Sequence, residues 1–218
     1  MKKLLCAAAF IAVTSASATA SDFSGPYIGA SAGYNWGDVD FSYEDGTTGF
    51  GDFSTTEDSS GFEAGLFAGF RHQFQSRFVL GAEAGIDLFS GAEADYTASL
   101  AGNTITVNIE KGHQFYLDLK PGFAVQPDML IYGLIGYQQT ELEGTVLLNG
   151  ASLGSDDEDF SAWRFGFGLE KTFTDNVSVR AQYNYADYSD ESWDYVNAQR
   201  ETWGGDENNV RIGLVLNF

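Results

Sequence analysis

Trp163-Arg164-Phe165-Gly166-Phe167-Gly168-Leu169-Glu170 is the stretch of sequence that decides the fold. Large apolar residues alternate there with glycine and charged residues, so the stretch has a period of two. This period predicts a β-strand with one apolar face and one small or charged face. The same alternation resumes after a turn at residues 174–176, over 177–185, and again over 209–218. The last 56 residues therefore predict three antiparallel strands.

The polar face of these strands consists of glycine and isolated charges. Solvent-facing strands of soluble sheets rarely have this composition, because glycine inside a strand weakens it. Glycine instead suits a narrow, crowded interior. In a transmembrane barrel the apolar row faces lipid and the polar row faces the lumen. The pattern therefore favours a transmembrane barrel over a soluble, lipocalin-like barrel, in which the apolar row would point inward.

Five upstream segments alternate in the same way, namely residues 27–36, 62–71, 78–88, 115–124 and 129–138. The connections between the eight expected strands are alternately long and short, as in outer-membrane barrels with their short periplasmic turns and long outer loops. We therefore predict an all-β, eight-stranded antiparallel up-and-down transmembrane β-barrel in the bacterial outer membrane, with both termini on the periplasmic side. The short turns are expected at 73–77, 126–128 and 174–176, and the long loops at 37–60, 90–112, 140–161 and 187–207.

Two of these segments contain irregular features. Pro121 falls on an outward row, and because proline cannot donate a hydrogen bond to a neighbouring strand, we expect a bulge or local kink there. Residues 129–138 are apolar in both phases, which leaves their facing undetermined. The alternating Ile105, Val107 and Ile109 suggest that the barrel extends above the membrane.

The N-terminus has the pattern of a secretory signal peptide: Lys2 and Lys3, an apolar run over residues 4–13, and small residues ending at Ala20. We predict a cleaved signal peptide over 1–20 and one outer-membrane barrel domain over 21–218. The single cysteine, Cys6, lies in the signal peptide, so the mature chain needs no disulfide. No segment reaches the roughly 18 apolar residues of a transmembrane helix.

The mature chain is strongly acidic, with 9 Lys plus Arg against 31 Asp plus Glu and a formal charge of −22. Nucleic acid is therefore disfavoured as a partner. The excess acids lie in the long loops, where solvation and mutual repulsion explain them. The alternative hypothesis is divalent-cation binding that bridges the loops to lipopolysaccharide. A barrel stability that is indifferent to chelator would argue against this hypothesis. No loop has the ligand spacing of a calcium hand, so we assign no metal site.

Ten charged residues fall on the predicted inward rows, five acidic and five basic. An eight-stranded barrel encloses only enough space for side chains, so these charges should be paired. We expect a closed, salt-bridged plug, and the alternative is a gate in which the ion pairs exchange partners. The residues are Glu63, Arg71, Glu83, Asp87, Asp118, Lys120, Arg164, Glu170, Arg180 and Arg211.

Catalysis would require a nucleophile with a partnered histidine or a similar group. The two histidines, His72 and His113, fall at opposite ends of the expected barrel, about a bilayer thickness apart. We therefore predict no catalytic residues, no metal site and no cofactor.

Residues 163–170, with 174–185 and Asp187-Tyr188, resemble the small outer-membrane β-barrel (porin-like) family related to the barrel domain of outer membrane protein A. The resemblance covers the whole mature chain and implies no shared catalytic residues. The last strand, ending at Phe218, is similar to the assembly signal read by the outer-membrane insertion machinery. It implies that this machinery and periplasmic chaperones are partners.

The function that these features favour is a non-catalytic protein of the Gram-negative envelope. It would contribute to envelope integrity and to surface interaction through its acidic loops. Its partners would be outer-membrane lipid, lipopolysaccharide and possible surface receptors. The alternatives are a narrow porin-like channel for small cations or solutes and, third, a lipid-modifying outer-membrane enzyme.

Overall fold

The computed structural model describes residues 23–44, 53–90, 93–100, 103–195 and 199–218. The predicted signal peptide lies outside these residues. Within them the chain forms nine strands: β1 (Gly25–Glu44), β2 (Phe53–Gln73), β3 (Phe78–Ser90), β4 (Glu93–Leu100), β5 (Asn103–Gln126), β6 (Met129–Leu148), β7 (Ala151–Thr174), β8 (Val177–Tyr195) and β9 (Gln199–Asn217).

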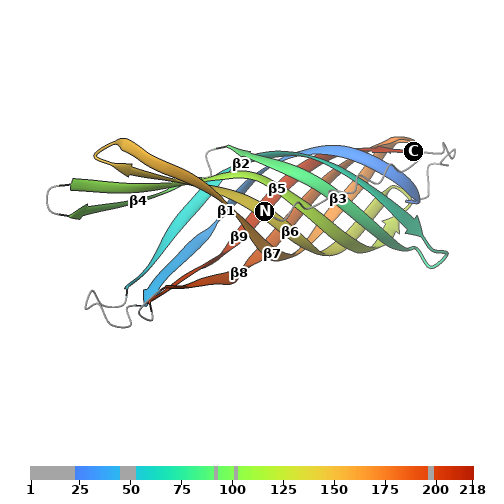
Figure 1. The fold of residues 1–218 in the computed structure, drawn as a ribbon. Helices are drawn as coiled ribbons and strands as arrows, with labels where there is room; N and C mark the ends of the chain where they lie inside the picture. The colour runs from blue at the N-terminus through green and yellow to red at the C-terminus, as the bar shows by residue number, and fades with distance from the viewer. Residues whose placement is uncertain (1–22, 45–52, 91–92, 101–102, 196–198) are drawn as a thin grey trace, which may run out of the picture.

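Eight of these strands close into a ring (Figure 1). The order is β3-β2-β1-β9-β8-β7-β6-β5, every neighbouring pair is antiparallel, and β3 pairs with β5 to complete the circle. Strand β4 pairs with the outer part of β5, beyond the ring. This topology confirms the predicted eight-stranded antiparallel barrel. In the described part of the chain, no helix has the length and apolarity needed to cross a membrane.

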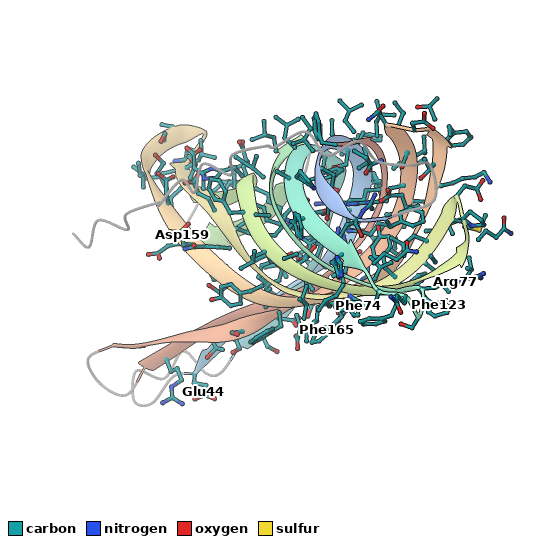
Figure 2. The ribbon with its side chains drawn as sticks, turned by 90° about the vertical axis from the view of Figure 1, so that its right-hand side faces the viewer. Glu44, Phe74, Arg77, Phe123, Asp159 and Phe165 are labelled. Atoms are coloured by element: carbon teal, nitrogen blue, oxygen red, sulfur yellow. The ribbon has the colours of Figure 1, made fainter. Side chains whose placement is uncertain are left out.

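Side chains alternate between lipid and lumen with the predicted period of two. In β7, Trp163 and Phe165 are exposed, whereas Arg164 between them is fully buried. Figure 2 shows Phe165 and Phe123 pointing away from the ring. Aromatic residues bound the outward apolar belt at both ends, as the girdles of outer-membrane barrels do. They include Tyr34, Trp36, Phe62, Tyr137 and Trp163 toward the outer end and Phe70, Phe74, Phe78, Phe123 and Phe173 toward the periplasmic turns.

The facing of β6, which the sequence left undetermined, is fixed by packing at the periplasmic end. Leu130, Tyr132 and Leu134 point inward and are buried together with Phe23 and Val79. The residues of the other row, such as Ile131 and Ile135, face outward. The strand is apolar in both phases because one phase faces lipid and the other fills the narrow end of the lumen.

Inward-facing glycines leave room for aromatic rings on the neighbouring strand. Gly85 pairs with Tyr116, and a methyl group added at Gly85 would collide with the tyrosine ring. Gly69 stands in the same relation to Tyr27. Steric crowding therefore explains the glycines of the polar rows, because the barrel is too narrow for large side chains at both positions of such an inward-facing pair.

The four long connections are largely strand, so the prediction of long loops was wrong. Pairing of β1 with β2 continues to Tyr43 opposite Phe53, and β8 stays paired with β9 as far as Tyr195. Strands β6 and β7 are joined at Asn149 and Gly150, with φ of 51° and 82°, values typical of a tight hairpin turn. One of these extensions holds the alternating Ile105, Val107 and Ile109, and pairing of Ile105 with Leu148 continues the barrel wall beyond the membrane.

At Pro121, where we expect a bulge or local kink, the register shows no bulge. The register between β5 and β6 is the same on both sides of it, with Leu119 opposite Ile135 and Gly122 opposite Tyr132. The shifts between these strands lie instead at Lys111/Gln114 and Ala124/Gln126. Pairing is interrupted at Pro121 without a change of register, which accommodates its missing N–H group.

Above the ring the wall divides into two four-stranded arms (Figure 1). Pairing of β2 with β3 ends at Phe62 opposite Ser90, and pairing of β7 with β8 ends at Ala162 opposite Tyr188. Beyond these points β2, β1, β9 and β8 form the first arm, and β4, β5, β6 and β7 form the second. In Figure 2, Glu44 lies on the first arm and Asp159 on the second.

Replacing Gly85 with alanine is expected to lower the free energy of unfolding by about 1–3 kcal/mol, because the added methyl group forces the buried Tyr116 ring to move. Gly133→Ala is the matched control. There the new methyl group would meet the Gly166 carbonyl oxygen at an ordinary 3.8 Å. Urea unfolding of the refolded barrel measures both variants, and equal losses would contradict the steric account.

Candidate functional site

The structure places all ten predicted inward charges inside the barrel, each with no more than 5% of its surface exposed. Ion pairs link five of them into one set at the periplasmic end, and the other five form two neighbouring sets toward the outer end, which we describe together. The periplasmic cluster consists of Arg71, Glu83, Lys120, Glu170 and Arg180. The outer cluster consists of Glu63, Asp87, Asp118, Arg164 and Arg211.

Arg180 is the centre of the periplasmic cluster. Its guanidinium contacts Glu83 at 2.5 Å and Glu170 at 3.2 Å. Arg71 is 2.9 Å from the other oxygen of Glu170, and Lys120 pairs with Glu83. Three bases therefore share two carboxylates, and the cluster has one positive charge in excess. Each carboxylate is held by at least two cations, which offsets the cost of burying it.

The outer cluster has the opposite imbalance. Arg211 lies 3.0 Å from Asp87 and 3.2 Å from Glu63, so two carboxylates share one guanidinium. Arg164 is 3.3 Å from Asp118. The Arg164 guanidinium carbon lies 4.2 Å from the centre of the Tyr116 ring, in a cation–π contact. With three acids and two bases, this cluster has one negative charge in excess.

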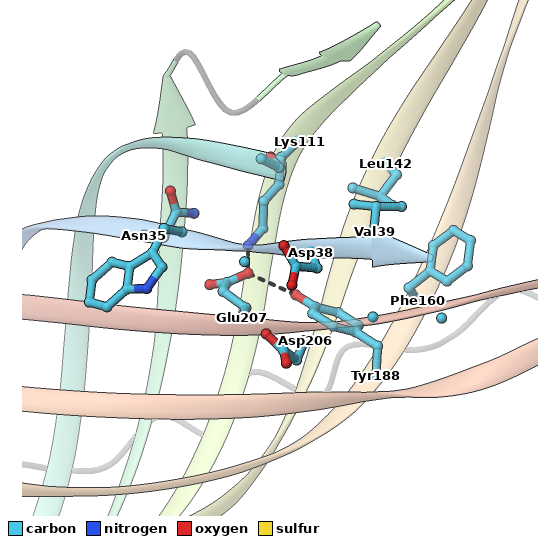
Figure 3. A pocket seen from close by; sticks show the side chains of 14 residues that line it. Asn35, Asp38, Val39, Lys111, Leu142, Phe160, Tyr188, Asp206 and Glu207 are labelled. Carbon is cyan, nitrogen blue, oxygen red and sulfur yellow. Dashed lines mark hydrogen bonds and ion pairs between the residues drawn. The ribbon is translucent and has the colours of Figure 1, made fainter. Parts of the chain in front are cut away.

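A third set of polar contacts crosses the outer mouth of the barrel (Figure 3). Lys111 pairs with Glu207, which also accepts a hydrogen bond of 3.1 Å from the Tyr188 hydroxyl. That hydroxyl is 3.1 Å from Thr140 Oγ1, so the mouth network joins β5, β9, β8 and β6. Sequence reasoning missed these residues, because they were assigned to loops. The extra residue in β5 between Lys111 and Gln114 also turns Lys111 inward, against the simple alternation.

The periplasmic end of the lumen is closed by Phe23. This side chain is 3% exposed, and the Arg71 guanidinium lies 5.0 Å from its ring centre. Its backbone N–H donates to Gln73 Oε1 at 3.0 Å. The cavity next to it, bordered by Tyr27, Arg71, Lys120, Tyr132, Glu170 and Arg180, has a volume of about 10 Å³. That is room for about one water molecule, so side chains fill this end of the barrel.

Phe218, the predicted assembly signal, follows the last residue of β9. Its N–H donates to the Pro26 carbonyl oxygen at 3.1 Å, which holds the chain end beside the start of β1. The residue therefore lies at the periplasmic rim of the barrel.

The outer face of the first arm has a row of four aspartates in register. Asp58 pairs with Asp38, Asp38 with Asp206, and Asp206 with Asp187, so the aspartate row crosses β2, β1, β9 and β8. The neighbouring Asp58, through hydrogen bonding and its charge, raises the pKa of Asp38. Partial burial and the charges of Asp40 and Asp187 raise the pKa of Asp206.

The two histidines lie far apart. Their pairing partners on β3, Leu80 for His72 and Leu88 for His113, are separated by eight residues, about 26 Å along the strand. His113 Nδ1 is 3.1 Å from a Glu141 oxygen. Among the residues that the structure describes, no group of three or more His, Cys, Asp or Glu side chains is arranged to hold a metal ion.

Comparison with known proteins identifies one family. The family model described as outer membrane protein beta-barrel domain matches residues 5–218. A 22 kDa outer membrane protein of Rhizobium leguminosarum bv. viciae is 27% identical over 177 residues, covering 79% of this chain and 74% of that protein. A 25 kDa outer-membrane immunogenic protein of Brucella abortus biovar 1 is 28% identical over 200 residues, covering 90% of this chain and 79% of that protein. The structure of Neisserial surface protein A has a TM-score of 0.46 and 14% identity, covering 88% of this chain and 97% of its own.

Arg180→Ala is expected to lower the free energy of unfolding by about 3–5 kcal/mol, because it removes charged hydrogen bonds to both Glu83 and Glu170 and leaves each buried carboxylate with a single cation. Lys171→Ala is the control, since it removes an exposed pair with Asp128 that contributes at most about 1 kcal/mol. Denaturant titration of the refolded protein compares the two, and an Arg180 variant as stable as the control would refute the pairing role.

Lowering the pH from about 7 through the raised carboxyl pKa values of Asp38 and Asp206 is expected to stabilise the first arm. The folded arm raises the carboxyl pKa of Asp38 and Asp206 above the ordinary 3.8, so charge repulsion opposes folding at neutral pH and is relieved as the pH falls through the raised values. Amide hydrogen exchange in residues 36–42, corrected for intrinsic rates, should slow accordingly. Asp58→Asn should weaken this response and Asp175→Asn, in a periplasmic turn, should not; identical responses would disprove the explanation.

Proposed function

This protein belongs to the outer membrane protein beta-barrel family, and from that premise we propose that it is a non-catalytic barrel that contributes to envelope integrity and presents its two arms for surface interaction. Its location is the bacterial outer membrane, and the resemblance to small outer-membrane barrels is confirmed by the family match and by the relatives. The observation that carries the proposal is the filled lumen: ten buried charges in two ion-paired clusters, with Phe23 below them.

The filled lumen supports a structural role for the barrel. Conduction would require the ion pairs of Arg180 and Arg211 to separate inside a low-dielectric interior, at a cost of several kcal/mol for each pair. A barrel closed in this way can serve as a rigid membrane anchor. What remains available for interaction is the surface outside the membrane.

The arms support the second half of the proposal. They are paired sheets that continue the barrel wall, so they hold a fixed surface above the membrane. Both are acidic: the first has the aspartate row, and the second has Asp157, Glu158 and Asp159 on β7. The Brucella abortus relative is named as immunogenic. We extend that property to this chain and assign the exposed epitopes to the arms.

The competing candidate is a narrow channel for small cations. Glu207 at the mouth and the aspartate row on the outer face near it favour this candidate, because their charges raise the local cation concentration. The third candidate, a lipid-modifying enzyme, has no comparable support, since His72 and His113 lie too far apart to act together.

The partners that we propose follow from the same geometry. Outer-membrane lipid contacts the apolar belt, and lipopolysaccharide head groups would lie near the aspartate row, two residues above Trp36 on β1. Phe218 at the periplasmic rim fits recognition by the insertion machinery, with periplasmic chaperones as earlier carriers. A surface receptor would bind the arms. The acidic charge argues against nucleic acid.

The proposal predicts no ion conductance from protein that is inserted in a planar bilayer, for the wild type and for Glu83→Gln alike. Antibodies raised against the folded protein should bind intact cells, and shortening both arms should abolish that binding while the barrel still folds. Bilayer recordings and cell-surface labelling provide the two measurements.

Discrete cation-selective current steps that change in Glu83→Gln would establish the channel instead. Antibody binding that survives removal of both arms would exclude the arms as the presented surface. Retained heat-resistant migration of the shortened variant in gels is the control for folding.

A further inference from the structure

The outer cluster contains buried oxygen atoms without hydrogen-bond donors. The Glu63 side chain is 1% exposed, and among the described residues no donor makes a hydrogen bond of ordinary geometry to either carboxylate oxygen, although the Asn209 amide, whose Nδ2 is also unpaired, lies close to Glu63. Arg211 Nε lies 3.2 Å from Glu63 but directs its hydrogen bond to Asn209 Oδ1, at 2.9 Å. Asn35, 3% exposed, likewise has an Oδ1 atom with no donor in the described part of the chain. Such atoms are costly unless a water, a proton or a cation satisfies them.

The net negative charge of the outer cluster favours a cation over a water molecule at these oxygens. Glu63, Asp87 and Asp118 are opposed by two arginines only. The nearest further base toward the mouth, Lys111, is bound to Glu207. A buried carboxylate without a full counter-charge is strongly destabilising, so a bound cation would remove an unfavourable contribution to folding.

A pocket at the outer mouth leads toward these oxygens. It has a volume of about 80 Å³, it is bordered by the paired Lys111 and Glu207, and it extends inward to Asn35 (Figure 3). Asn35 lies one inward-facing position above Gly33, which is directly opposite Glu63. That step is about 7 Å along the strand. The pocket therefore ends at Asn35, one inward-facing position from the residue opposite Glu63.

We propose that the outer lumen binds one monovalent cation of about the size of sodium, between the Glu63 carboxylate and the Asn35 carbonyl oxygen. The oxygen ligands suit a hard cation. The single excess negative charge, and the absence among described residues of a three-carboxylate group, select a monovalent over a divalent ion. The ion completes the charge balance of the plug and links barrel stability to sodium outside the cell. This site is independent of the surface role of the arms.

The test is thermal unfolding of the refolded wild-type barrel in sodium chloride and in choline chloride at equal ionic strength. Sodium about tenfold above its dissociation constant should raise the unfolding temperature by about 3–6 °C over choline. Glu63→Gln should abolish this difference, because the amide removes the excess charge with little change in shape. Asp38→Asn, on the outer face of the first arm, should retain it.

Asn35→Ala provides a second variant if Glu63→Gln fails to fold, and it should reduce the sodium effect. Equal unfolding temperatures in sodium and choline would overturn the proposal and assign water to these oxygens. A wild-type stability that depends on pH but not on the cation would overturn it in favour of a proton on Glu63. A sodium effect unchanged in both Glu63→Gln and Asn35→Ala would place the ion elsewhere and refute the site.

Discussion

Inside a membrane no water is available for the backbone, so every N–H and C=O group must be hydrogen-bonded within the protein. Pairing of β3 with β5 meets this requirement, because it joins the two ends of the sheet and removes its free edges. Closure with only eight strands makes the interior narrow. The inward glycines beside aromatic rings and the dense packing of polar groups are consequences of that narrow interior.

The polarity of the interior is the complement of the apolar outer wall. Because the strands alternate, an apolar row for lipid leaves the other row for the lumen, and this chain fills it with charged residues. Burying them is costly, and replacing such pairs with apolar residues is often neutral or stabilising in other proteins. The ion pairs are therefore evidence that the lumen side chains adopt one specific arrangement, and are weak evidence for stability. The periplasmic cluster has one excess positive charge and the outer cluster has one excess negative charge. The filled barrel therefore has an electric dipole along its axis.

Outside the membrane the constraint of closure is relaxed, and the wall divides. Water can satisfy the free edges of β2 and β8 beyond Phe62 and Tyr188, so the arms can separate. Neither face of the arms has to be apolar, and acids gather on the first arm because they are not required to pair. The same four strands thus change from a lipid-facing wall to a charged surface, and the surface role proposed for the protein depends on that change.

The sequence by itself determined the fold within the membrane. The period of two and the inward place of the ten charges follow from the need for an apolar outer row, and the even strand number follows from antiparallel closure of an up-and-down sheet. It did not determine the arms, because both faces of exposed hairpins such as β6–β7 contact water and neither face has to be apolar. It also could not locate Lys111, since a single inserted residue in β5 reverses the facing of every residue beyond it. Which acid meets which base was decided only by the tertiary structure. Arg211 and Asp87 are 124 residues apart in the chain, and only closure of the ring brings them together.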